Sequence, residues 1–189
     1  MDHGLAGRSE EAGAMPFEGE LIVQELDDTS WLLVAPLVYE GNSELFNLDT
    51  GFVTDFASVP RCLVWLVPRY GVYSKSAVLH DYLCGRRDIS RADADGLFRR
   101  SMRELGVAFV RRWMMWAGVR GASKLAGAGG GEVALWLLVA IPSLIFVLIP
   151  GLLIIAWLFL FWLVELMFFV VLKPVSKKPV PRPRLWMKT

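Results

Sequence analysis

This 189-residue chain has few cysteines, few histidines and almost no net charge, and each of these features argues against a class of function. The formal net charge is +1, which gives no electrostatic basis for binding nucleic acid, so we expect no nucleic-acid partner. The only histidine besides His80 is His3, and this argues against a zinc site. A Gly-x-Ser-x-Gly motif is missing, which argues against a classical serine triad.

The two cysteines, Cys62 and Cys84, do not form a framework of disulfides. Free cysteines are usually buried, so two buried thiols are the simpler interpretation, and a disulfide between them is the alternative. The N-terminal residues lack the apolar core of a cleavable signal peptide. They show no hydrophobic periodicity, and we expect residues 1–18 to be a disordered leader.

Charge is nearly absent from residues 133–172, where Glu165 is the one ionisable residue. Forty residues in a straight helix measure about 60 Å, twice the ~30 Å hydrocarbon core of a bilayer. Pro150 and Gly151 interrupt the run near its middle, so we expect a transmembrane helical hairpin, with a re-entrant hairpin as the alternative. Basic residues flank both ends, which predicts that the preceding domain and the tail both lie on the cytoplasmic side of a membrane.

The rest of the sequence predicts an α+β fold. Residues 20–26, 31–40 and 44–53 have the pattern of strands in a small antiparallel β-meander. A helical hairpin from residues 76–85 and 91–105 follows, and residues 107–120 form a basic helix rich in Trp and Met. The expected organisation is a leader (1–18), an α+β domain (19–122), a Gly/Ala linker (123–132), a membrane hairpin (133–172) and a basic, Pro-rich tail (173–189).

His80 and Asp81 interrupt an apolar helical run and are the first candidates for a functional site. Burying an unpaired carboxylate costs several kcal/mol or more, so buried acidic groups persist only with partners. Asp95 heads the apolar face of the next helix, whereas Ser90 and Asp93 have the spacing of a helix cap. We therefore expect the hairpin to bring Asp95 beside His80.

Three motifs, Gly51–Arg61, Ala77–Leu83 and Ala94–Phe98, resemble a family of uncharacterised domains found in phages and prophages. The resemblance covers about residues 20–106. It implies a phage or prophage origin and partners among phage structural proteins, rather than a particular reaction.

The helix pair also resembles phospholipase A2. That resemblance implies that His80 is a general base, Asp95 the carboxylate that orients it, and Asp81 a ligand of calcium. Asp55 is either a cap or turn carboxylate or a further ligand of the cation. The chain lacks the Gly-rich, Cys-containing calcium loop and the disulfides of that family.

Two functions follow from these observations. The first is a non-catalytic, membrane-anchored phage or prophage protein that acts in virion assembly, injection or modification of the host envelope, with the lipid bilayer as partner. Its His-Asp-Asp cluster is then a structural polar network. The second is a calcium-dependent ester hydrolase that acts on phospholipid and uses His80, Asp81 and Asp95.

Overall fold

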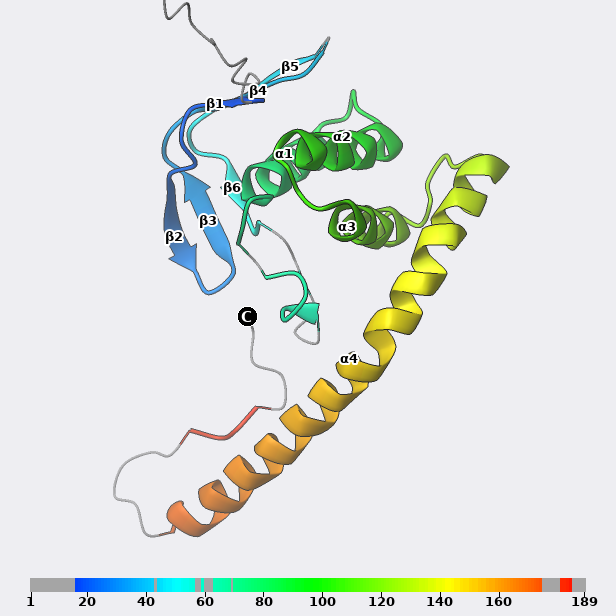
Figure 1. Cartoon of the computed structure of the whole chain (residues 1–189). Helices are drawn as coiled ribbons and strands as arrows, with labels where there is room; N and C mark the ends of the chain where they lie inside the picture. The colour runs from blue at the N-terminus through cyan, green and yellow to red at the C-terminus, as the bar shows by residue number, and fades with distance from the viewer. Residues whose placement is uncertain are drawn as a thin grey trace, which may run out of the picture.

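The computed structural model describes residues 16–42, 44–56, 59, 63–68, 70–174 and 181–184. Residues 1–15 of the expected leader and Cys62 lie outside this set, while Phe17–Glu18, at the end of the expected leader, form strand β1. Within the described residues, six short strands precede four helices, and this order confirms the α+β class (Figure 1).

The strands form two antiparallel sheets of three strands each, in the orders β1-β4-β5 and β2-β3-β6. The elements are β1 (Phe17–Glu18), β2 (Val23–Asp27), β3 (Ser30–Leu33), β4 (Leu37–Glu40), β5 (Leu45–Leu48) and β6 (Val53–Thr54). The prediction of a single meander is therefore wrong, because two of its three expected strands each divide between the sheets.

In each of the two expected strands, a local feature of the backbone explains why the strand divides between the sheets. Pro36 lacks an N–H and separates β3 from β4, so the chain leaves one sheet there and enters the other. Gly51 adopts a φ of 92° between β5 and β6, a conformation that favours glycine, and its N–H donates to the Leu33 carbonyl oxygen at 2.8 Å. The chain thus leaves the β2-β3-β6 sheet after β3, forms β4 and β5 in the other sheet, and returns at β6, which places Thr54 against the first helix.

Three helices pack beside the sheets: α1 (Ser74–Gly85), α2 (Arg91–Glu104) and α3 (Phe109–Ala122). Helix α1 is buried on two faces. Val78, Leu79 and Leu83 pack with the strands, whereas Ala77 packs with residues of α2 and α3. This double burial explains why the run around His80 is apolar nearly all round.

Helix α4 (Gly130–Leu172) contains the whole apolar run, and the expected hairpin is wrong (Figure 1). Pro142 and Pro150 lie inside one continuous helix. Ile149, Pro150 and Gly151, where the reversal was expected, are helical and form no turn. A continuous helix keeps every backbone hydrogen bond except those that proline cannot donate.

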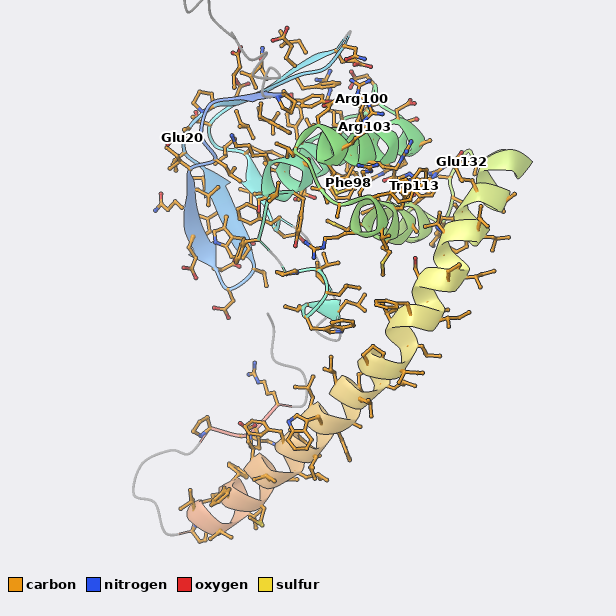
Figure 2. All side chains as sticks on the ribbon, viewed as in Figure 1. Glu20, Phe98, Arg100, Arg103, Trp113 and Glu132 are labelled. Carbon is orange, nitrogen blue, oxygen red and sulfur yellow. The ribbon has the colours of Figure 1, made fainter. Side chains whose placement is uncertain are left out.

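Apolar side chains project from α4 along its length (Figure 2). Leu138, Ile149 and Trp157 are each about 70% exposed. Among the described residues, α4 alone is long and apolar enough to cross a membrane, with a mean hydropathy of 2.9 over its most apolar window. The expectation that both flanks face the cytoplasm depended on the hairpin. A continuous helix that crosses once places its ends on opposite faces of the bilayer.

Candidate ionic site at the helix junction

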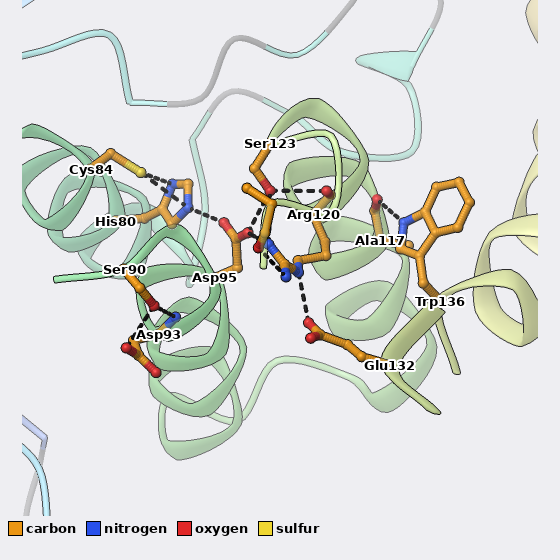
Figure 3. Close-up of polar contacts among 11 residues, drawn as sticks. His80, Cys84, Ser90, Asp93, Asp95, Ala117, Arg120, Ser123, Glu132 and Trp136 are labelled. Carbon is orange, nitrogen blue, oxygen red and sulfur yellow. Dashed lines mark hydrogen bonds and ion pairs between the residues drawn. The ribbon is translucent and has the colours of Figure 1, made fainter. Parts of the chain in front are cut away.

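His80 and Asp95 meet between α1 and α2, as predicted from their positions in the sequence. The His80 Nε2 and Asp95 Oδ1 atoms are 2.8 Å apart (Figure 3). Only 1% of the Asp95 side chain is exposed, and His80 is largely buried. The start of α2 fixes the position of Asp95, because the Ser90 side chain accepts a hydrogen bond from the Asp93 N–H, as the cap pattern predicts.

The second oxygen of Asp95 binds residues at the end of α3. The Ser123 hydroxyl donates to Asp95 Oδ2 at 2.9 Å, and Arg120 Nη1 lies 3.5 Å from the same oxygen. Arg120 is completely buried. The carboxylate of Asp95 thus contacts an imidazole, a hydroxyl and a guanidinium, which is the compensation that a buried charge requires.

Arg120 extends the contacts from α3 to the start of α4. Its Nε donates to Glu132 Oε1 at 2.7 Å, and its Nη2 donates to the Ala126 carbonyl oxygen at 2.9 Å. Nearby, the Trp136 indole N–H donates to the Ala117 carbonyl oxygen at 2.9 Å (Figure 3). We call His80, Asp95, Arg120, Ser123 and Glu132 the ionic network; it joins all four helices.

Sequence reasoning identified two members of the ionic network and missed the other three. Arg120 belongs to a helix with several arginines, and the periodicity of that helix gave no reason to bury one of them. Ser123 and Glu132 lie in the expected linker, where polar residues normally face solvent. The position of Glu132 could have indicated a role for it, because it is the last ionisable residue before the apolar run.

The charge state of His80 follows from its neighbours. Burial lowers the pKa of His80, but the hydrogen bond with Asp95 and the contact with Cys84 outweigh burial and raise the pKa to about 9. The Cys84 sulfur lies 3.5 Å from Nε2 and 3.9 Å from Nδ1, one helical turn after His80. His80 is therefore an imidazolium at neutral pH, and a protonated imidazole cannot accept a proton from water.

Asp81 does not join the ionic network. Its Oδ2 accepts a hydrogen bond from the Thr54 hydroxyl at 2.6 Å, and the same Thr54 oxygen accepts the Phe56 N–H at 3.0 Å. Burial raises the pKa of Asp81 to about 7; the Thr54 hydroxyl opposes this rise, and the charge of the neighbouring Asp55 adds to it. We call Thr54, Asp55 and Asp81 the carboxyl cluster.

The carboxyl cluster brings together the two residues predicted to bind a cation, Asp55 and Asp81. Calcium takes six to eight oxygen ligands, usually several of them carboxylates. Across the ranges that the structure describes, no group of three or more His, Cys, Asp or Glu side chains is arranged to hold a metal ion. Calcium binding at Asp55 and Asp81 therefore stays a prediction.

Residues 31–119 match the model of a family described as a protein of unknown function, DUF1353. The matched segment runs from β3 into α3 and contains His80, Asp81 and Asp95, but it ends before Arg120, Glu132 and α4. No curated protein and no solved structure matches the chain. The match agrees with the expectation of an uncharacterised domain and shows no link to phages or to phospholipase A2.

Proposed function

We propose that this protein is a membrane-anchored, non-catalytic domain, and that its ionic network fixes the α+β domain to the anchor. The observation that carries the proposal is the continuity of the network. His80 on α1 binds Asp95 on α2, Asp95 binds the end of α3, and Arg120 of α3 binds Glu132 in the first turn of α4. The family match ends before this last contact, so the anchor is an addition to the matched segment.

The exposure of α4 supports the anchor. Only 6% of its most apolar window is buried within the protein, whereas the core helix of a soluble protein is mostly buried. About 20 apolar residues are enough to cross the hydrocarbon core of a bilayer. The 43 residues of α4 exceed that length, so a single upright crossing leaves part of the helix outside the hydrocarbon core.

The charges of the ionic network favour a structural role over a catalytic one. Both oxygens of Asp95 are occupied, and His80 carries a proton at neutral pH. Removing one partner from a buried ion pair costs about 3–5 kcal/mol, so this arrangement holds the helices together only while it is complete. The resemblance of the three motifs to phage domains is the support for a role in virion assembly, injection or modification of the host envelope.

The alternative is an ester hydrolase of phospholipid, and the 2.8 Å contact between His80 and Asp95 is the observation in its favour. A general base at neutral pH needs a pKa near 7, whereas the pKa of His80 is raised to about 9. Asp81, the expected calcium ligand, accepts a hydrogen bond from the Thr54 hydroxyl at 2.6 Å. Calcium-dependent release of fatty acid by the full chain, abolished by His80→Gln, would favour the hydrolase over the structural role.

The anchor itself is tested by fractionation and hydrogen exchange of the full chain. We expect the protein to remain in membranes after alkaline carbonate extraction. Glu132→Gln should leave it there but raise amide exchange in residues 117–136 by about tenfold, because one charge-assisted hydrogen bond to Arg120 is lost. The matched control is Glu104→Gln, which lies outside the network. Recovery of the wild-type chain in the soluble fraction would refute the anchor, and unchanged exchange in Glu132→Gln would refute the coupling.

A further inference from the structure

A cavity of about 380 Å³ opens beside the ionic network, between α1, α2 and the end of α3. Its lining includes His80, Cys84, Arg91, Asp95, Ser123 and Lys124. The volume lies in the range of small-molecule sites. Neither the helix anchor nor the pairing of His80 with Asp95 explains why two further cations, Arg91 and Lys124, line this space.

The cavity has an excess of positive charge. His80, Arg91 and Lys124 are cationic, and the single lining carboxylate, Asp95, is already bound by His80, Ser123 and Arg120. In the part of the chain that the structure describes, no carboxylate lies within ion-pair distance of Arg91 or Lys124. Such a lining attracts an anion.

The cavity also lies next to the start of the anchor. Ser123 and Lys124 follow directly on α3, and α3 packs against the first turns of α4 through Trp136, whose indole N–H binds the Ala117 carbonyl oxygen. The apolar run begins at Val133. Tryptophan is enriched where a helix passes from the headgroup layer into hydrocarbon. The cavity is therefore placed near the headgroup layer of a bilayer that α4 enters.

We infer that this cavity binds a phosphate-type anion, and that the phosphate of an anionic lipid headgroup is its source. The inference rests on the proposed anchor for the identity of the source but not for the binding of the anion. The Arg91 guanidinium, the Lys124 ammonium and the His80 ring N–H are donors of the kind that bind phosphate oxygens. No bond to the phosphate forms or breaks, so the site is a binding site.

Backbone conformation gives the cavity a defined rim. Lys124 and Leu125 have φ values of 52° and 51°, in the left-handed region that residues with a side chain rarely adopt. The Leu125 N–H donates to the Arg120 carbonyl oxygen, which turns the chain back at the end of α3 and holds Lys124 beside the cavity.

The test uses the full chain in nanodiscs of phosphatidylcholine, with and without added phosphatidylglycerol, and in detergent with inorganic phosphate. Amide exchange of residues 119–128 is the readout. We expect phosphatidylglycerol to slow exchange in the wild-type chain. Arg91→Gln and Lys124→Gln should each weaken the response about fivefold, since one basic side chain at an anionic surface contributes about a factor of five. The control, Arg103→Gln, removes an exposed charge from the other end of α2.

The outcomes separate the two sources of phosphate. Protection by phosphatidylglycerol alone assigns the site to a lipid headgroup, whereas protection by inorganic phosphate at millimolar concentration shows that free phosphate is sufficient. Protection by neither, or equal protection in Arg91→Gln, Lys124→Gln and wild-type chains, would overturn the inference. The detergent experiment needs no bilayer, so it tests the cavity even if the chain fails to fractionate with membranes and the anchor is refuted.

Discussion

Two aspartates of this protein, Asp81 on helix α1 and Asp95 on the neighbouring helix α2, have very different surroundings. Asp95, in the ionic network, is surrounded by a protonated His80, a buried Arg120 and the Ser123 hydroxyl. Asp81, in the carboxyl cluster, has the Thr54 hydroxyl and the like charge of Asp55. The difference lies in the partners: Asp95 contacts an imidazole, a hydroxyl and a guanidinium, whereas burial raises the pKa of Asp81 to about 7, opposed by the Thr54 hydroxyl and increased by the charge of Asp55.

The largest effect is expected from removing the charge at the centre of the ionic network. Asp95→Ala should lower the free energy of unfolding by about 3–5 kcal/mol, because it leaves His80 buried without its carboxylate and removes one of the two carboxylates that contact the buried Arg120. Tryptophan fluorescence during urea unfolding of the full chain in detergent measures the change. Asp93→Ala, on the same helix but exposed, is the control and should cost about 1 kcal/mol. Equal losses in the two variants would contradict the assigned role of Asp95.

A second effect concerns pH. The pKa of His80 is about 9 in the folded protein and 6.5 without partners, so the folded chain holds this proton more tightly. The resulting stability is complete below pH 6.5 and is lost as the pH rises through about 9, a change of about 3 kcal/mol. Unfolding measured from pH 6 to pH 10 should show this loss in the wild-type chain. His80→Gln should flatten the curve, and an unchanged slope in that variant would assign the loss to other groups.

The smallest effect, and of opposite sign, is expected in the carboxyl cluster. Because the pKa of Asp81 is raised from 3.8 to about 7, its ionisation destabilises the folded chain as the pH rises between these values. The shift alone sets an upper limit of about 4 kcal/mol at pH 7, and the weaker hydrogen bond from Thr54 to a neutral amide oxygen offsets part of it. Asp81→Asn should therefore stabilise the protein by about 1–2 kcal/mol at pH 7 and by nothing at pH 4. The exposed Asp49→Asn is the control. Destabilisation by Asp81→Asn at both pH values would show that the carboxyl group is needed in its ionised form.

The helices and their central contact were predictable from the sequence. Apolar positions at helical spacing indicated α1 and α2, and a short connection between them predicted that Asp95 would reach His80. The strands were predicted less well. Their patterns were visible, but the assignment of each strand to one of two sheets depended on a change of direction at Pro36 and at Gly51, which the alternation of side chains does not reveal.

For helix α4, the sequence indicated the composition of the segment but not the path of the chain. Its apolar composition was evident, and the length of about two bilayers favoured a hairpin over one helix. The structure keeps the helix continuous through both prolines, since each removes only one donor from the helix. Composition identified a long apolar segment, and it did not identify whether the chain folds back within that segment.

The sequence by itself determined which residues of this protein are apolar or lie on an inner face: an apolar helix around His80, an acidic residue on the inner face of the next helix and a long apolar run with Glu165 as its one ionisable residue. Only the tertiary structure decided which partners each buried polar group has. Arg120 reaches Asp95 from a third helix and Glu132 reaches Arg120 from a fourth, and periodicity within one element contains no information about such distances. Electrostatic energy depends on those distances and on exclusion of water, so the ionic network exists only once all four helices are in place.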